Sequence, residues 1–304
     1  MDNIITTRGI TLEHGIQDKR SNRGILLISC PDRPGIVSKV STTLYEHDCN
    51  IIDSNQHSTD PEAGHFFLRI EFECSDLENK KRSIEKSFEL LSETFDMKYS
   101  FNYGSESQNL AIFVSKENHC LLELLLEWQR GDLLGDIKLV VGNHEDLREY
   151  VENVNIPFYY LPITRETKEE VEKKQLELLK EYQIDTIVLA RYMQILSPAF
   201  IEHYPYQIIN IHHSFLPAFI GANPYKRAYE RGVKLIGATA HYVTDDLDEG
   251  PIIEQDIERV KHHHELSDLK KIGSQVERKV LLKAVKWHNS HRIIPFGNKT
   301  IVFD

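Results

Sequence analysis

Cysteine is scarce in this chain of 304 residues, which contains only Cys30, Cys49, Cys74 and Cys120. Their spacing matches neither a Cys-x-x-Cys motif nor a disulfide framework. We therefore expect four reduced thiols that lie in the core or near the surface.

Long apolar runs and a surplus of positive charge are lacking as well. No run approaches the length of a membrane span, and the start from Met1 to Ile5 lacks the basic-then-apolar pattern of a signal peptide, so we expect a cytoplasmic protein without membrane association. The chain has 36 basic and 47 acidic residues, a net charge of −11. This balance argues against non-specific nucleic-acid binding and fits an enzyme that acts on small molecules.

Two catalytic fingerprints are missing. The chain has no Gly-x-Gly-x-x-Gly for a nicotinamide cofactor and no Gly-x-Ser-x-Gly elbow for a serine hydrolase. The stretch from His262 to Glu265 lacks a second histidine at the spacing that a zinc-binding helix needs, so we expect a solvated loop before a helix. We expect no metal and no redox cofactor.

Two segments carry the strongest chemical pattern, one from Ile208 to Pro217 and one from His241 to Pro251. Asn210 and His212 are two apart at the end of an apolar run, so strand alternation projects both from one face. An amide donor beside an imidazolium can hold a carbonyl oxygen that gains negative charge during attack. The carboxylate of Asp248 would raise the proton affinity of the imidazole and hold a water or an amine.

The simpler alternative is that this amide and imidazole only satisfy backbone groups at a strand end. The flanking Pro217, Gly250 and Pro251 favour a catalytic set instead. His213 competes for the acid role, but alternation along a strand directs it to the opposite face.

The order of apolar and polar segments predicts two domains. From residue 110, five short apolar runs alternate with helical stretches, which predicts a doubly wound, mainly parallel sheet in an α/β domain whose ligands lie at the carboxyl ends of the strands. The charged stretch 166–180 reads as a solvated amphipathic helix without a functional role. The five expected strands are 110–114, 137–141, 158–163, 186–190 and 208–211. We expect a lead over 1–22, flexible or packed on the first domain, then domains over 23–101 and 110–304 with a linker at 102–109.

These motifs resemble the formyltransferase family that handles 10-formyltetrahydrofolate. The resemblance carries the catalytic asparagine, histidine and aspartate onto Asn210, His212 and Asp248, and makes the segment 190–198 the loop that holds the pterin. The loop from Val243 to Asp248 would form the other wall of the pocket. The resemblance implies substrate-binding roles for Arg191, Tyr192, Met193, Gln194, Leu196, Ser214, Gly221, His241, Val243, Thr244 and Asp245.

One departure selects a branch of this family. Members that pass the formyl group to a phosphorylated ribosyl amine have a Gly-Ser-Asn loop after the first strand, whereas this chain has the glycine-free segment 115–121 there. Water is then the simplest acceptor. Segments 219–222 and 238–242 resemble the formyltetrahydrofolate deformylases, which implies hydrolysis of the folate substrate to formate and tetrahydrofolate, a supply of formate for purine synthesis and a balanced one-carbon pool. Asn223 and Lys226 depart from the family pattern in the loop after Gly221.

Residues 24 to 100 predict a small ferredoxin-like α+β unit with the order strand, helix, strand, strand, helix, strand. The strands are expected at 25–29, 50–53, 65–72 and 97–103, with a first helix that buries Ile36, Val40 and Leu44 and a second over 77–94. The turn Asp32-Arg33-Pro34-Gly35 resembles the ACT domain, a regulatory module that binds amino acids. That resemblance implies an effector such as glycine or methionine at Asp32, Arg33, Gly35, Ile36 and Asn50. A purely assembling role is equally open, and the edge strand predicts a homo-oligomer, at least a dimer.

Two other functions stay open. A formyltransferase that uses the same folate donor and a small amine acceptor would share the fold. A non-enzymatic folate or amino-acid sensor would belong to another class, although a protein that only binds needs no catalytic set.

Overall fold

The computed structural model describes residues 21–60, 64–217 and 224–304. The expected lead over 1–22 lies almost wholly outside the described residues. The chain divides into two compact units, one of residues 1–107 with Phe303 and Asp304, the other of residues 108–302, and each is described by itself.

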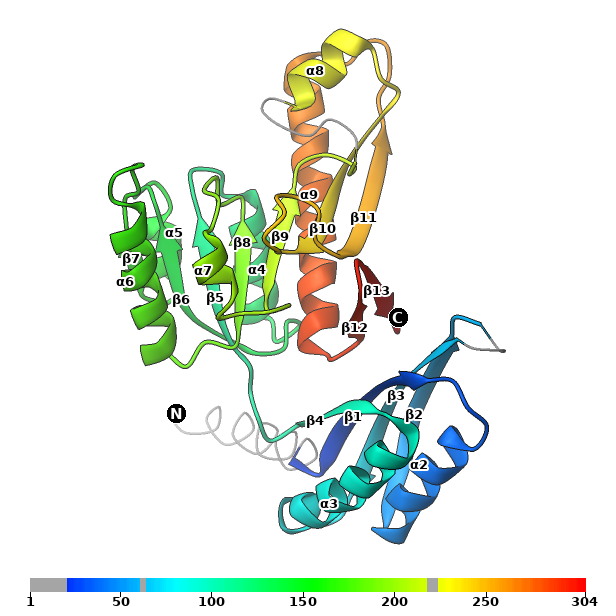
Figure 1. Ribbon diagram of the computed structural model, residues 1–304. Helices are drawn as coiled ribbons and strands as arrows, with labels where there is room; N and C mark the ends of the chain where they lie inside the picture. The colour runs from blue at the N-terminus through cyan, green and yellow to red at the C-terminus, as the bar shows by residue number, and fades with distance from the viewer. Residues whose placement is uncertain (1–20, 61–63, 218–223) are drawn as a thin grey trace, which may run out of the picture. The chain divides into compact units, whose positions relative to one another are not determined.

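The first unit has the predicted ferredoxin-like order (Figure 1). Its elements are β1 (Arg23–Pro31), α2 (Ile36–Glu46), β2 (Cys49–Ser58), β3 (His65–Cys74), α3 (Leu77–Phe95) and β4 (Lys98–Tyr103). The antiparallel sheet has the strand order β2-β3-β1-β4, so β2 and β4 are its edges. Ile36, Val40 and Leu44 of α2 are buried as the helical spacing predicts, and with Phe88 of α3 they belong to one core.

The second unit is built on a seven-stranded sheet. Its elements are β5 (Asn109–Val114), α4 (His119–Gln129), β6 (Asp136–Gly142), α5 (Arg148–Glu152), β7 (Phe158–Tyr160), α6 (Lys168–Glu181), β8 (Thr186–Ala190), α7 (Pro198–Ile201), β9 (Ile208–His212), α8 (Pro224–Arg231), β10 (Leu235–Tyr242), β11 (Ile252–Arg259), α9 (Leu266–Asn289), β12 (Ile293–Phe296) and β13 (Lys299–Val302). The strand order is β11-β10-β9-β8-β5-β6-β7. The strands β5 to β9 pair in parallel, whereas β10 and β11 pair antiparallel.

Helices cover both faces of this sheet, which confirms the predicted doubly wound α/β architecture (Figure 1). Leu121 of α4, Val151 of α5 and Val280 of α9 pack in the core on one face. Leu179 of α6 and Phe200 of α7 pack in the core on the other. The strand order reverses at β5, because the chain builds outward first to β6 and β7 and then to β8 and β9. Ligand sites in such sheets lie at this point, outside the carboxyl ends of the strands.

Some boundaries differ from the expected ones. The strand expected over 158–163 ends at Tyr160. The polar connection between the units is shorter than 102–109, because β4 extends to Tyr103 and β5 begins at Asn109. The antiparallel strands β10 and β11 were not among the five expected strands.

All four cysteines are free and buried, as the sequence predicts. Burial raises the pKa of the Cys30 thiol to about 11, so this thiol stays protonated at neutral pH. Within the described part of the chain, no helix is both long and apolar enough to cross a membrane.

Candidate functional site

A cavity of about 730 Å³ lies where β5, β8 and β9 end in the second unit. Its wall includes His119 at the start of α4, Arg191 just after β8, and Asn210 and His212 on β9. Residues from the loop after β10, Asp248 among them, form another part of the wall. The site therefore lies where the sheet topology predicts a ligand.

The three predicted catalytic residues converge in this cavity. His212 Nδ1 lies 3.2 Å from Asp248 Oδ2, so Nδ1 carries a proton and donates a hydrogen bond to the carboxylate. Among the described residues, no group hydrogen-bonds Nε2 of His212, although this atom is buried. A buried nitrogen without a partner is costly, and here it lines a ligand-sized cavity. It is therefore the atom of His212 that is available to a ligand in the cavity.

His241 joins the set from the neighbouring strand, because β10 pairs Asn210 directly opposite His241. Its Nδ1 lies 2.9 Å from the carbonyl oxygen of Tyr242, and a carbonyl only accepts, so Nδ1 is protonated. Its Nε2 lies 3.2 Å from Asn210 Nδ2 and 3.6 Å from Asp248 Oδ1. His241 thus connects the amide to the carboxylate and fixes their spacing.

Asp248 is held as a carboxylate. Burial acts to raise the pKa of this carboxyl, but the hydrogen bond from His212 and the nearby ring of His241 outweigh burial and hold the pKa well below its usual value. Its backbone has φ of 58°, in the left-handed region where non-glycine residues are uncommon.

The prediction that His213 points away from the site is wrong. The strand β9 ends at His212, so the alternation of a strand no longer applies to the next residue. His213 lines the same cavity, and its ring centroid lies 5.3 Å from that of His212 and 6.2 Å from that of Tyr225. Burial, aided by the charge of Arg191, lowers the pKa of His213 to about 4. It is therefore neutral at pH 7 and a poor acid.

Most of the predicted substrate-binding residues line the cavity. These are Arg191, Tyr192, Met193, Gln194, Leu196, His241, Val243, Thr244 and Asp245. Met193, Ile195 and Leu247 are exposed apolar side chains on this wall, and such a group is typical of a surface that receives a flat, partly apolar ligand.

Two predicted contacts differ. Ser214 is buried, and its carbonyl accepts a hydrogen bond from the hydroxyl of Thr239 at 2.9 Å, so it supports the strand pair and is not part of the cavity wall. Gly221 lies outside the described residues, as does Asn223. Lys226 lines the cavity.

The loop after β8 is held by side chains to which the sequence analysis assigned no role. Ser115 Oγ accepts from the backbone N of Met193 at 2.9 Å. Glu172 Oε1 accepts from the backbone N of Ser197 at 2.9 Å, and Gln175 Nε2 donates to the hydroxyl of Tyr192 at 3.0 Å. Glu172 and Gln175 belong to α6 and are buried. The helix α6, which was predicted to be solvated and without a functional role, therefore positions the cavity wall.

Glu172→Ala should raise KM for the substrate by about tenfold, because the Ser197 backbone N–H would lose its buried acceptor. Glu172→Gln keeps an oxygen at that position and should change KM far less. Steady-state kinetics of both variants test this, and an equal rise in KM for the two would show that the charge matters rather than the hydrogen bond.

The sequence analysis also did not predict the cluster of charged residues at one end of the cavity. The buried carboxylate of Glu277, on α9, is paired with His119, Arg191 and Tyr225. The signal available in the sequence was a glutamate on the apolar stripe of α9, between Val276 and Val280.

Buried His288 stabilises the strands that carry the site. Its Nδ1 lies 2.9 Å from the hydroxyl of Tyr242, and its Nε2 lies 3.0 Å from the hydroxyl of Thr186 and 3.1 Å from Gln207 Oε1. Burial lowers the pKa of His288 to about 3, with a smaller contribution from His291. The folded protein therefore holds this ring neutral.

Acid should destabilise the fold through His288. Its stability contribution is complete above about pH 6.5, the unfolded value, and is lost as pH falls toward about 3, because only the unfolded state takes up the proton. The loss is on the order of 5 kcal/mol. Urea unfolding at stepped pH tests this: His288→Asn should flatten the dependence, and the same slope in both proteins would contradict it.

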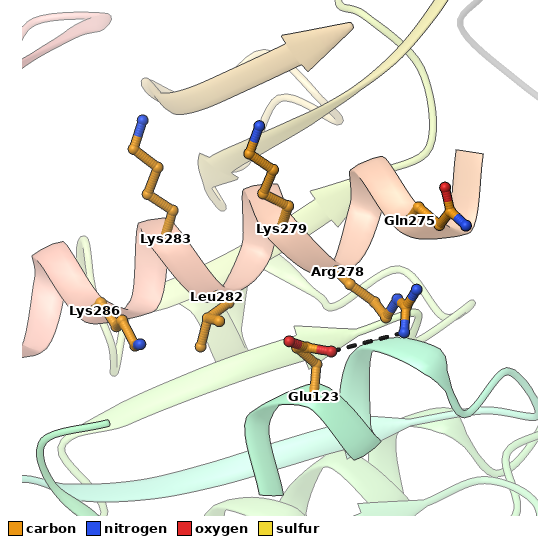
Figure 2. A pocket seen from close by; sticks show the side chains of 7 residues that line it. All are labelled: Glu123, Gln275, Arg278, Lys279, Leu282, Lys283 and Lys286. Carbon is orange, nitrogen blue, oxygen red and sulfur yellow. Dashed lines mark ion pairs between the residues drawn. The ribbon is translucent and has the colours of Figure 1, made fainter. Parts of the chain in front are cut away.

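A second hollow, of about 420 Å³, lies along α9 away from the catalytic set (Figure 2). Its basic side chains are paired with carboxylates: Arg278 with Glu123 at 3.7 Å, Lys279 with Asp256 at 2.6 Å, Lys283 with Glu254, and Lys286 with Glu127 at 2.5 Å. The positive charge is neutralised within the chain, so this hollow is not an anion site.

In the first unit, some residues of the turn that was predicted to bind an effector already contact other residues of the chain. Gly35 has φ of 95° and allows the turn before α2. The Ser58 hydroxyl donates to the carboxylate of Asp32. The side chain of Ile36 is 2% exposed and belongs to the core, so a ligand at this turn would meet the backbone of Ile36 and not its side chain. Asn50 is exposed.

Comparison with known proteins assigns families to both units. A family model described as formyl transferase matches residues 108–285, and a model described as ACT domain matches residues 24–89. A formyltetrahydrofolate deformylase from Bacillus subtilis (strain 168) is 62% identical over 288 residues, which are 95% of this chain and 96% of the relative.

Solved structures agree. A formyltetrahydrofolate deformylase from Pseudomonas syringae pv. tomato str. DC3000 is 42% identical with a TM-score of 0.90, covering 97% of this chain and 100% of its own. A phosphoribosylglycinamide formyltransferase from Coxiella burnetii is 27% identical with a TM-score of 0.60, and covers 65% of this chain and 94% of its own.

Proposed function

The chain belongs to the formyltetrahydrofolate deformylase family, and on that premise we propose that it hydrolyses 10-formyltetrahydrofolate through Asn210, His212 and Asp248. The reaction yields tetrahydrofolate and formate. The observation that carries the proposal is the partnerless Nε2 of His212 in the cavity, with Nδ1 held 3.2 Å from the Asp248 carboxylate.

The nucleophile is a water held against the formyl carbon. Asp248 is ionised and accepts a hydrogen bond from this water, while His241, 3.6 Å from the same carboxylate, restrains it. Asn210 and protonated His212 donate to the formyl oxygen as it gains negative charge. The negative charge of Asp248 stabilises the imidazolium of His212.

Collapse of the tetrahedral intermediate completes the reaction. The bond between the formyl carbon and the folate nitrogen breaks, the nitrogen takes up the proton that the attacking water has lost, and the water oxygen leaves within formate, whose acid proton passes to solvent. No metal or redox cofactor takes part in the proposed steps. The exposed apolar side chains Met193, Ile195 and Leu247 on the cavity wall hold the pterin ring.

The test is formate release from 10-formyltetrahydrofolate in buffer alone and again with glycinamide ribonucleotide added. A hydrolase turns over in buffer alone and is not accelerated by the amine. Turnover only with the amine would replace this proposal by the transferase alternative, which the more distant structural match to a formyltransferase does not favour. No turnover in either arm would point to a sensor.

The first unit is an ACT domain by its family match and its fold, and we propose that it binds glycine or methionine at the turn from Asp32 to Gly35. Thermal unfolding against a panel of amino acids tests this. An effector should raise the melting temperature, and Arg33→Ala should abolish the rise. A panel without any stabilising amino acid would leave assembly as the domain's role.

The proposal also covers the oligomeric state and the cellular compartment of the protein. The exposed edges β2 and β4 can pair with a second copy of the ACT domain, which would give a homo-oligomer. Light scattering of the full chain measures the oligomer directly. The cytoplasm remains the predicted compartment.

A further inference from the structure

Two of the four cysteines lie opposite each other in the sheet of the ACT domain. The antiparallel strands β2 and β3 pair Cys49 with Cys74. Both side chains are buried and belong to the core that the sheet forms with α2 and α3, so both lie on the same face of the sheet. Among the described residues, the other two cysteines have no cysteine opposite them: Cys30 pairs with Phe66 on β3, and Cys120 lies on α4 of the second unit.

The hydrogen-bond ladder shows which kind of cross-strand pair this is. The backbone N–H of Cys74 donates to the carbonyl of Asn22 at 2.9 Å, on the side of β1, and the N–H and C=O of one strand residue point to the same side. Cys74 therefore turns neither group toward β2, and Cys49 and Cys74 form a non-hydrogen-bonded pair. In such pairs the Cα atoms are about 4.5 Å apart and the side chains come closest. A disulfide requires a Cα separation of about 4.4 to 6.8 Å, so the backbone can accept the bond as it stands.

The two thiols also share a hydrogen-bond acceptor. Cys49 Sγ donates to the carbonyl oxygen of His47 at 3.8 Å, and Cys74 Sγ donates to the same oxygen at 3.5 Å. Two sulfur atoms that reach one acceptor are neighbours in space. Lys80 Nζ donates to this oxygen as well, at 3.1 Å. Loss of both S–H donors would therefore leave the carbonyl with a partner, and oxidation would not leave it unsatisfied.

The surroundings keep the pair protonated at neutral pH. Burial, with a smaller effect of the neighbouring Cys74 thiol, raises the pKa of Cys49 to about 12, while the charge of Lys80 acts to lower it. Because the thiolate is the species that reacts with oxidants, the pair reacts slowly and stays reduced until oxidant is in excess. Cys49 is 8% exposed and Cys74 is 1% exposed, so an oxidant reaches Cys49 first.

We propose that Cys49 and Cys74 are an oxidation site, at which a peroxide joins them in a reversible cross-strand disulfide that connects β2 to β3 in the ACT domain. The sulfur of Cys49 attacks one oxygen of hydrogen peroxide, the O–O bond breaks, and the hydroxide that leaves takes up the thiol proton as water. The sulfur of Cys74 then attacks the sulfenic acid of Cys49, the S–O bond breaks, and hydroxide leaves with the Cys74 proton as a second water. Two thiols thus lose two electrons, which reduce one peroxide to two waters.

The disulfide would restrain one edge of the ACT sheet. The strand β2 is an edge strand, and Asn50, which follows Cys49 directly, belongs to the predicted effector site. A bond at this place holds the start of β2 against β3 and leaves the open side of β2 free to pair with a second copy. The proposal does not depend on the hydrolase activity, because both cysteines lie in the first unit.

The experiment treats the full-length wild type with hydrogen peroxide under native conditions. Cys30→Ser is the matched control, because it removes a buried cysteine from the same sheet and the same core. After removal of the peroxide, the protein is unfolded, its free thiols are blocked with N-ethylmaleimide, and its peptides are mapped by mass spectrometry without reduction. A second sample is oxidised in urea, where the native strand pairing is absent.

We expect one linked peptide pair, Cys49 with Cys74, in native wild type and in Cys30→Ser, and a single-chain band on a non-reducing gel. Dithiothreitol should restore both thiols, because a disulfide is reversible and a sulfinic acid is not. The sample oxidised in urea should give a mixture of pairs. Cys74→Ser lacks the resolving thiol, so dimedone should trap about tenfold more sulfenic acid at Cys49 in this variant than in the wild type.

Three results would overturn the proposal. The first is the absence of the linked peptide from peroxide-treated native protein. The second is the same mixture of pairs in the native and the urea samples, which would show that the fold does not select this pair. The third is a link that forms only between two chains. The wild-type peptide map decides among these results by itself, so the test holds even if a serine variant does not fold.

Discussion

Replacing His212 with alanine should lower kcat by about a thousandfold or more, because the formyl oxygen would lose the charged donor that stabilises its developing negative charge. KM should change much less, since the apolar wall that we propose to hold the pterin does not involve His212. Single-turnover kinetics with saturating substrate separates the two effects.

The neighbouring His213 supplies the matched control. It lines the same cavity, but its pKa of about 4 keeps it neutral at pH 7, so it cannot supply the charged donor that we propose for His212. His213→Ala should therefore lose far less activity than His212→Ala. Equal losses in the two variants would contradict the assignment of His212.

Asp248→Asn should lower kcat by about a hundredfold to a thousandfold, because an amide neither stabilises the imidazolium of His212 nor accepts a hydrogen bond from the attacking water as strongly. The carboxyl pKa lies well below its usual value, so Asp248 is ionised throughout the working pH range. The loss should therefore be the same factor from about pH 6 to about pH 9.

Asp246→Asn is the control for this variant. It removes an exposed carboxylate from the same loop, two residues away and outside the cavity wall. It should retain nearly the wild-type rate. A comparable loss in Asp246→Asn would mean that the charge of the loop acts at long range, and that the contact of Asp248 with His212 has no special role.

The sequence predicts the part of the site that follows from strand geometry. A period of two places Asn210 and His212 on one face, and the loop that ends at Asp248 follows the antiparallel strand β10 beside them. The same rule fails one residue later, because β9 ends at His212 and His213 turns toward the cavity. Alternation holds only as long as the ladder of hydrogen bonds continues.

The site residues that the sequence did not predict are polar side chains on the apolar faces of helices. Gln175 lies midway between Val171 and Leu179 at spacings of four, and Glu277 lies between Val276 and Val280. Such positions predict burial, and a buried polar group needs a partner. The partners cannot be read from the sequence, because His119 is 158 residues away from Glu277 and only the packing of α9 against α4 brings them together.

The central claim is that water, activated in this cavity, is the formyl acceptor. The most direct measurement is mass spectrometry of the formate released from 10-formyltetrahydrofolate by the wild type in ¹⁸O-labelled water. Because the attacking water becomes part of the product, each formate should carry a solvent oxygen. Formate without the label, or release of tetrahydrofolate without formate, would contradict hydrolysis at this site.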